Sequence, residues 1–120
     1  PWDRWEWGGP GWRDHVRTDV SAGIVGAELQ GDDPTAMAAR WGEVVGRTPV
    51  RVGDSWRIGL DDGGELRFVV ARDGRGDGLG AFDVAVRDPA AVRATAKTRG
   101  LTDAQGEVVL SGARVRLVQG

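Results

Sequence analysis

The chain has 120 residues, 40% of them hydrophobic and 28% charged, and its formal net charge is -2 at pH 7. That length fits one domain with a single core, and the near-neutral charge, with arginines scattered among acids, argues against nucleic acid as a partner. No apolar run approaches the roughly 20 residues of a membrane span, and the absence of cysteine excludes disulfides and thiolate metal sites. We therefore expect a cytoplasmic protein that binds neither membrane nor nucleic acid.

Residues 1–21 form a tryptophan-rich arm outside the rest of the predicted fold. The opening PWDRWEWGGPGW holds four of the six tryptophans: Trp2, Trp5, Trp7 and Trp12. Stacking platforms for a sugar need a rigid frame, which the Gly- and Pro-rich stretch 8–11 does not provide. The chain also begins with Pro, and its one methionine is Met37. We interpret the arm as an interdomain linker that packs on its own domain or on a domain missing from the front of the sequence.

The first predicted helix follows an apolar run that begins at about residue 23. Asp33-Pro34 is a strong helix start, because Asp caps free amides and Pro fits the first turn. Gly46 stands where a helix C-terminus favours a residue with positive φ. We expect the buried face of this helix to hold Met37, Trp41, Val44 and Val45, which recur at helical spacing.

A pair of strands is predicted after this helix, at about 55–60 and 65–71, with DDGG as the turn and Val50–Val52 as a further short strand. The hairpin register has two solutions. A loop of four residues places Ile58 opposite Arg67, and a loop of three places Ile58 opposite Phe68 over the core. The second is favoured, because Trp56, Ile58 and Leu60 then share a face with Leu66, Phe68 and Val70.

The same plan recurs in the second half of the chain. An apolar run leads to Asp88-Pro89, and a helix that buries Val92 and Ala96 ends at Gly100. Strands are predicted at about 106–110 and 113–119. The sequence thus predicts an α+β domain over 22–120, built from two β-α-β-β(-β) modules at about 22–72 and 78–119. They form a curved, cleft-containing antiparallel or mixed sheet with the helices on its outer face. A ferredoxin-like domain is the alternative for this element order.

The repeated strand-Asp-helix segments resemble the vicinal oxygen chelate superfamily, the glyoxalase, bleomycin-resistance and extradiol-dioxygenase fold. Its typical module has an apolar strand, an Asp, a helix with an aromatic residue two-thirds of the way along, and a closing Gly. Asp33, Trp41 and Gly46 stand at those places, and Asp88 to Gly100 repeat the pattern one residue shorter. The chain resembles in particular the C-terminal domain of a longer glyoxalase-like protein.

Enzymes of this superfamily hold a divalent metal with His and Glu side chains from the first and last strand of each module. The resemblance places these positions at Gly26, Ala81, Arg67 and Arg116. Glycine and alanine have no side-chain donor atom, and a guanidinium offers no lone pair. The one histidine, His15, lies outside both modules. We therefore expect neither metal nor cofactor in this domain.

Strand alternation predicts what lines the cleft instead of a metal site. The side chains expected to face it, and our candidates for ligand binding, are Glu28, Gln30, Arg67, Asp83, Arg114 and Arg116. Arginines near Glu28 and Asp83 suggest ion pairs that take the place of the cation. Alternatively, Arg67 or Arg116 holds the carboxylate of a ligand by a bidentate contact.

One histidine, three serines and no cysteine leave no nucleophile constellation. The first functional hypothesis is a metal-free glyoxalase-like domain that binds a small molecule or serves as a structural half of a larger protein or homodimer. A second is part of a metal-dependent lyase, isomerase or dioxygenase whose metal lies in a missing N-terminal domain. A third is a drug-sequestering resistance protein with an aromatic cleft between two chains. The catalytic residues stay unassigned.

Overall fold

The computed structural model describes residues 6–120 of the chain. The elements in chain order are η1 (Glu6–Gly8), η2 (Trp12–His15), β1 (Ser21–Gly31), α1 (Pro34–Val45), β2 (Val50–Val52), β3 (Ser55–Gly59), β4 (Glu65–Val70), β5 (Gly78–Val86), α2 (Pro89–Thr98), β6 (Val108–Leu110) and β7 (Ala113–Gln119). Among the described residues, neither helix is long and apolar enough to cross a membrane.

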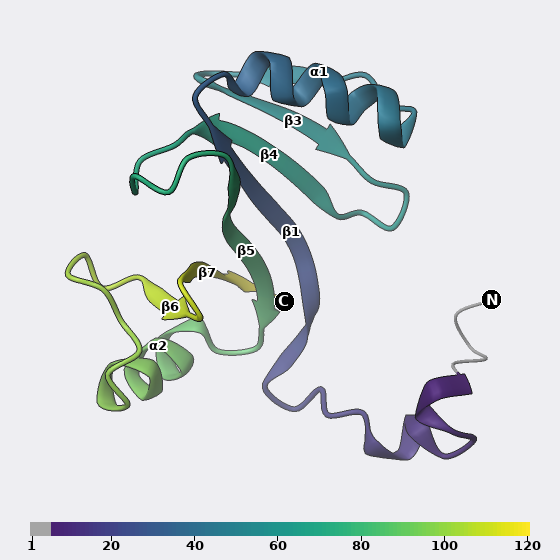
Figure 1. Cartoon of the computed structure of the whole chain (residues 1–120). Helices are drawn as coiled ribbons and strands as arrows, with labels where there is room; N and C mark the ends of the chain where they lie inside the picture. Colours follow the sequence, from purple (N-terminus) through teal and green to yellow (C-terminus); the bar gives the residue numbers. More distant parts are fainter. Residues whose placement is uncertain (1–5) are drawn as a thin grey trace.

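All strands join one open, seven-stranded sheet with the order β2-β3-β4-β1-β5-β7-β6. The first strands of the two modules, β1 and β5, pair antiparallel at its centre, and each has the last strand of its own module as a parallel neighbour, β4 and β7 respectively. Figure 1 shows the two modules extending in opposite directions from this central pair. The predicted α+β fold with two repeated modules in one mixed sheet is confirmed.

Both helices begin at the predicted Asp-Pro pairs. The Asp33 Oδ1 accepts a hydrogen bond from the amide of Ala36 at 2.9 Å, and the Asp88 Oδ1 accepts one from the amide of Ala91 at 3.0 Å. These contacts satisfy amides that a helix N-terminus leaves without an intrahelical partner. After the helices, Gly46 and Gly100 both have φ of 68°, the left-handed conformation expected of them.

The predicted buried face of α1 is wrong in the last turn of the helix. Val44 is 71% exposed and Val45 is 36% exposed, whereas Ala38 and Gly42 are buried. The reason lies in the chain after the helix, which folds back against Gly42: a Cβ there would lie 2.6 Å from the Arg47 carbonyl oxygen. This connection covers the Gly42 side of the helix and leaves the two valines in solvent.

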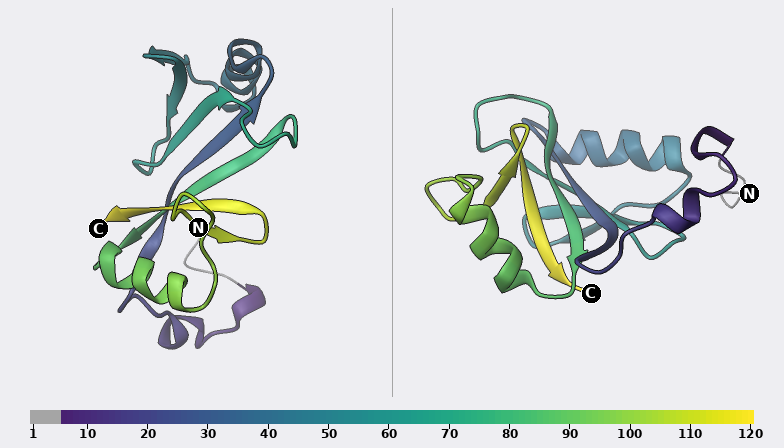
Figure 2. Two further views of the ribbon diagram at one scale, coloured as in Figure 1. Left: turned by 90° about the vertical axis from the view of Figure 1, so that its left-hand side faces the viewer. Right: turned by 90° about the horizontal axis from the view of Figure 1, so that it is seen from below.

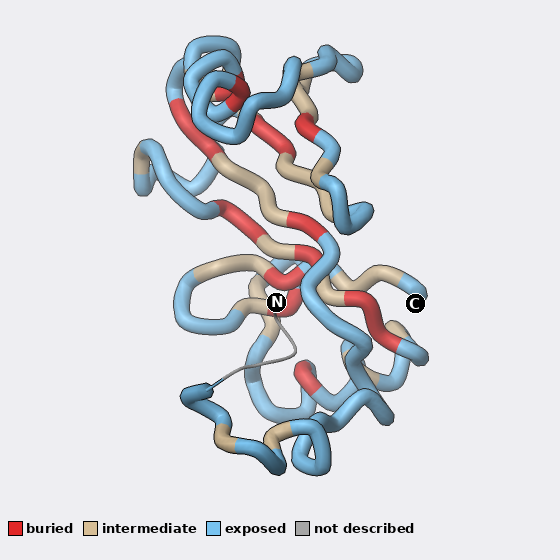
Figure 3. Tube along the Cα trace, turned by 90° about the vertical axis from the view of Figure 1, so that its right-hand side faces the viewer, coloured by how far each residue is buried: buried red, intermediate tan, exposed pale blue. Residues whose placement is uncertain are grey.

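The core lies between the sheet and the helices in two clusters, one in each module. Trp41, although 38% exposed, reaches the first cluster, with its ring centroid 6.1 Å from that of Phe68. The first cluster comprises Ala38, Ile58 and Phe68 with Leu29, Met37, Trp56, Leu60 and Leu66 around them. The second comprises Ala96, Val108 and Val115 with Phe82, Val84 and Leu117. Figure 3 shows that the buried segments follow the central strands. The predicted alternation of the strands is confirmed.

The hairpin of β3 and β4 has a register that the sequence did not predict. Ile58 lies opposite Leu66, not Phe68, and Trp56 lies opposite Phe68. The Leu60 amide donates to the Gly64 carbonyl at 2.8 Å, so the loop has the expected three residues, 61–63, but lies one residue earlier in the chain than the predicted pairing requires. The two-residue offset keeps every side chain on its expected face, since the period of a strand is two.

The arm leads away from the sheet, and its described part adds little to the core. Trp7 is 93% exposed, and Trp12 is half-buried with the Arg13 guanidinium carbon 5.2 Å from its ring centroid. Figure 2 shows the arm, in purple, well separated from α2 in the view from below. Trp2 and Trp5 lie outside the described residues. The structure therefore places Trp7 in solvent and not against its own domain.

Candidate functional site

The predicted site residues lie on the side of the sheet opposite the helices. Pairing places Glu28 of β1 beside Arg67 of β4, and Asp83 of β5 beside Arg116 of β7. Side chains of directly paired residues share a face, so a row of charges crosses the central strands. We call this surface the ion-pair face; its charged members are Glu28, Arg57, Glu65, Arg67, Asp83, Arg114 and Arg116.

A buried ion pair between Arg67 and Asp83 forms the centre of this face. The Arg67 Nη1 donates to Asp83 Oδ2 at 2.5 Å and the Nη2 donates to Oδ1 at 2.9 Å, a bidentate contact. The two residues are 4% and 3% exposed. They reach each other across β1, where a Cβ on Gly26 would lie 2.6 Å from Asp83 Oδ2. The absence of a side chain at Gly26 therefore makes room for the pair.

Ion pairs on both sides extend the central one. The Arg116 Nη2 donates to Asp83 Oδ2 at 2.9 Å, and the Arg114 Nη2 donates to Glu28 Oε1 at 2.7 Å. The Glu28 Oε2 lies 3.8 Å from the Arg67 Nε. The side chains of Arg114 and Arg116 remain 34% and 52% exposed. These outer arginines, unlike Arg67, keep part of their guanidinium surface in solvent.

Sequence reasoning missed two members of the network, Arg57 and Glu65. The Arg57 Nη1 donates to both carboxylate oxygens of Glu65 at 3.3 Å, and Glu65 Oε1 lies 3.8 Å from the Arg67 Nη1. The signal for Glu65 was its position two residues before Arg67, which puts both on one face of the strand. Arg57 was harder to find, because its place opposite Arg67 depends on the hairpin register.

The buried pair keeps both of its charges. Burial alone would raise the pKa of Asp83, but the hydrogen bond and the charge of Arg67, helped by Arg116, outweigh it and lower that pKa. The hydrogen bond with Asp83 raises the pKa of Arg67 against the opposing effect of burial. Each partner thus stabilises the charged form of the other.

Gln30 shares the face but belongs to a different contact. It is 1% exposed, and its Nε2 donates to Asp73 Oδ1 at 2.6 Å and to the Gly76 carbonyl at 3.3 Å. Hydrogen bonds from Arg75 and then from Gln30 lower the pKa of Asp73. A Cβ on Gly80 would lie 2.7 Å from Gln30 Oε1, so the side-chain oxygen of Gln30 packs closely against the Gly80 backbone. Gln30 therefore ties the loop between the modules to β1.

The residues at the superfamily's metal positions do not fit a divalent cation. Gly26 and Ala81 have no donor atom, and Arg67 directs its protons at Asp83. Asp83 itself fills the space over Gly26. Within residues 6–120, no three His, Cys, Asp or Glu side chains gather closely enough to hold a metal ion.

The ion-pair face is suited to recognising one negative charge. It carries four guanidinium groups and three carboxylates, which leaves an excess of one positive charge. Arg67 is enclosed and has both Nη atoms engaged with Asp83. A guanidinium has five N–H donors, and Arg114 and Arg116 are partly exposed, so these two can still bind an anion.

No protein-family model and no curated protein matches the sequence. Solved structures do match the fold. Methylmalonyl-CoA epimerase from Mycobacterium tuberculosis superposes with a TM-score of 0.61 at 12% identity over 87% of this chain and 91% of that one. Two variants of Streptomyces coelicolor methylmalonyl-CoA epimerase in complex with 2-nitronate-propionyl-CoA give 0.51 at 13% identity over 83% and 98%.

These epimerases are members of the superfamily that the sequence resembles, and they share its sheet of paired modules over most of the present chain. At this low identity the similarity concerns the fold and not the activity. The chain has the vicinal oxygen chelate fold, the glyoxalase-like fold that its two strand-Asp-helix segments predict.

Proposed function

We propose that this chain is a glyoxalase-like domain that works without the superfamily's divalent metal and binds a small anionic molecule on its ion-pair face. The observation that carries the proposal is the buried Arg67–Asp83 pair. The guanidinium of Arg67 is a fixed cation, and it comes from a strand position where the resemblance to the superfamily's enzymes places a metal ligand. A guanidinium cannot activate a bound water or act as a Lewis acid, so the role that this arrangement favours is binding.

Arg114 and Arg116 are the residues we assign to ligand contact. Arg114 and Arg116 are two residues apart on β7, so both side chains lie on the ion-pair face, and each is only partly buried. A carboxylate is the group that such guanidinium pairs bind best. The structural neighbours are named for a CoA ester that carries a carboxylate, which makes CoA esters of dicarboxylic acids the first ligands to test.

The metal part of the proposal is tested by titrating the domain with zinc, nickel and manganese, followed by calorimetry and by thermal shift. We expect no stoichiometric heat and no rise in the melting temperature. The proposal rests on the absence of a group of metal-ligating side chains among residues 6–120. Tight binding at one metal per chain would therefore refute it.

The ligand part is tested with two matched compounds, methylmalonyl-CoA and propionyl-CoA, which differ by one carboxylate. Methylmalonyl-CoA should bind the native domain more tightly, and Arg116→Gln should weaken it by about tenfold, since a hydrogen bond to a charged group contributes about 1.5–3 kcal/mol. Arg93→Gln is the control, because Arg93 is exposed on α2 away from this face. Equal binding of the two compounds would contradict the assignment.

We further propose that the domain is one half of a larger assembly, formed with a second domain or a second copy. Apolar side chains in solvent support this: Ile24 is 72% exposed, Val44 is 71% exposed and Trp7 is 93% exposed. Light scattering on the purified domain distinguishes a dimer from a monomer. His and Glu at the metal positions of an upstream module would favour the alternative of a metal-dependent enzyme.

A further inference from the structure

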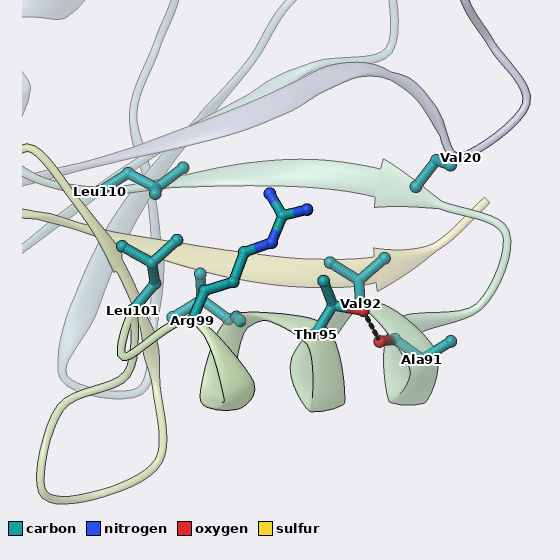
Figure 4. Close-up of a pocket in the computed structure, with 9 residues that line it drawn as sticks. Val20, Ala91, Val92, Thr95, Arg99, Leu101 and Leu110 are labelled. Carbon is teal, nitrogen blue, oxygen red and sulfur yellow. Dashed lines mark hydrogen bonds between the residues drawn. The ribbon is translucent and has the colours of Figure 1, made fainter.

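An apolar pocket of about 390 Å³ lies beside α2, in the second module (Figure 4). Val92 and Ala96 of the helix form one side of it, and Leu101, Val108 and Leu110 contribute further apolar surface. The pocket shares no residue with the ion-pair face. Its volume lies within the roughly 300–1,000 Å³ of typical small-molecule sites.

The comparison of the two modules explains why the pocket is open. Counted from the capping Asp of each helix, Met37 in α1 corresponds to Val92 in α2, and Trp41 corresponds to Ala96. Met37 packs on the first core cluster and the ring of Trp41 contacts Phe68. The smaller side chains of α2 cannot fill the equivalent space. The pocket thus lies beside helix positions that hold a methionine and a tryptophan in the first module.

One charged side chain lines this apolar pocket. The guanidinium of Arg99, which corresponds to Val44 of the first module, extends over the space between α2 and the neighbouring strands in Figure 4. Its side chain makes no hydrogen bond or ion pair within residues 6–120. The hydroxyl of Thr95 donates to the Ala91 carbonyl at 3.0 Å, so its proton is already used. Arg99 is therefore the polar group available to a ligand's head group.

We propose that this pocket binds a small apolar carboxylic acid, with its chain or ring against Val92, Ala96 and Leu110 and its carboxylate on Arg99. An apolar lining favours a hydrocarbon body, and one unpaired guanidinium at its edge selects one negative charge. This second site does not depend on the ligand assigned to Arg114 and Arg116.

Octanoate and the uncharged 1-octanol are the probes, and binding is followed on the full chain by calorimetry and by amide chemical shifts. Octanoate should bind, with shifts confined to α2, β6 and the residues around Leu101, and 1-octanol should bind at least tenfold more weakly. Arg99→Gln should weaken octanoate by about tenfold. Arg93→Gln, on the same helix but outside the pocket lining, should leave it unchanged.

Refilling the space gives a second variant. Ala96→Trp restores the residue found at this place in the first module and should abolish octanoate binding while leaving the binding of methylmalonyl-CoA unchanged. The proposal is overturned if the native chain does not bind octanoate, if 1-octanol binds equally well, or if Arg99→Gln has no effect. Shifts centred on Arg114 and Arg116 would also overturn it, because they would place the acid on the ion-pair face.

Discussion

The Arg67–Asp83 pair is held in place by its surroundings as much as by its own attraction. Taking two charges out of water costs several kcal/mol for each ion, and only good geometry with further hydrogen bonds offsets this. Here the contact is bidentate, Arg116 gives Asp83 an additional hydrogen bond, and Glu28 and Glu65 lie near the Arg67 guanidinium. Gly26 lets the carboxylate sit directly on the backbone. The pair therefore joins β4 to β5 across β1 with its charges enclosed and fully hydrogen-bonded to each other.

Removing one partner of this pair should be far more costly than removing one of its neighbours. Arg67→Met leaves Asp83, at 3% exposure, as a buried carboxylate with one remaining arginine, and should lower the free energy of unfolding by about 3–5 kcal/mol. Urea denaturation at neutral pH measures this loss. Arg116→Gln is the matched control: its side chain is 52% exposed, so the loss should stay below about 1 kcal/mol. Similar losses for both variants would show that Arg67 does not hold the centre.

At the scale of the elements, the two helices should depend equally on their capping aspartates. Asp33 and Asp88 each accept one amide hydrogen bond at the helix start, and replacing such a cap by alanine costs about 1 kcal/mol. Asp33→Ala and Asp88→Ala should therefore each lower the unfolding free energy by about that amount. Asp32→Ala provides the control, since the side chain of Asp32 makes no hydrogen bond within the described residues. An equally large loss for Asp32→Ala would mean that charge near the helix, and not the cap, is responsible.

The elements that the sequence predicts well are those governed by local rules. Asp-Pro starts, left-handed glycines and the period of two within a strand gave the helix bounds, the strands and the face of each side chain, including the charged row from Glu28 to Arg116. The failures occurred where the chain turns back after an element, because the periodicity within that element does not predict how the following residues pack. Val44 and Val45 follow the helical period but are uncovered, because the next segment packs on Gly42. The pairing of Ile58 with Leu66 depended on how the turn closed.

The site was predicted less completely than the fold, because its contacts join side chains of strands that are distant in the sequence. The alternation of the strands assigned its residues to one face. It did not predict which arginine contacts which carboxylate, because the Arg67 side chain extends across β1 to Asp83 on β5. The burial of Arg67 was therefore not predicted. The pocket beside α2 was also missed, although the sequence contains a signal for it. The substitution of Ala96 for a tryptophan and of Val92 for a methionine, between otherwise parallel helices, marks a place where the second module has less to fill its core.

At the scale of the whole molecule, the repeated plan gives two modules that share one sheet but differ on their two faces. The ion-pair face joins them, because Arg67 and Asp83 come from different modules and meet across β1. On the side of the sheet that carries the helices the modules are separate, since each has its own hydrophobic core cluster. The cluster of the second module borders the pocket beside α2. A duplicated fold can thus keep a common centre while the side chains of its two copies diverge beside the helices.

The arm is the part of the molecule whose contribution to folding should be smallest. Its described residues are exposed except for Gly9 and Trp12, which are half-buried. Its attachment begins later, where the Arg87 Nε donates to the Thr18 carbonyl at 3.1 Å and the Arg87 amide donates to the Val20 carbonyl at 3.1 Å. Removal of residues 1–15 should therefore leave the melting temperature within about 2 °C, since about 1 kcal/mol is needed for a shift of 4–8 °C in a domain of this size.

A longer truncation gives the matched comparison. Removal of residues 1–20 also takes away both acceptors of Arg87 and leaves its buried neighbour Val86 at an unsupported end of the sheet, so a fall of several degrees is expected. Differential scanning calorimetry on the full chain and the two truncated forms measures both shifts. A fall of about 5 °C or more on removal of residues 1–15 alone would show that the tryptophans pack on this domain. An unchanged value would instead leave them free for a neighbouring domain or a second copy, because Trp7 at 93% exposure has no apolar surface of its own domain to cover it.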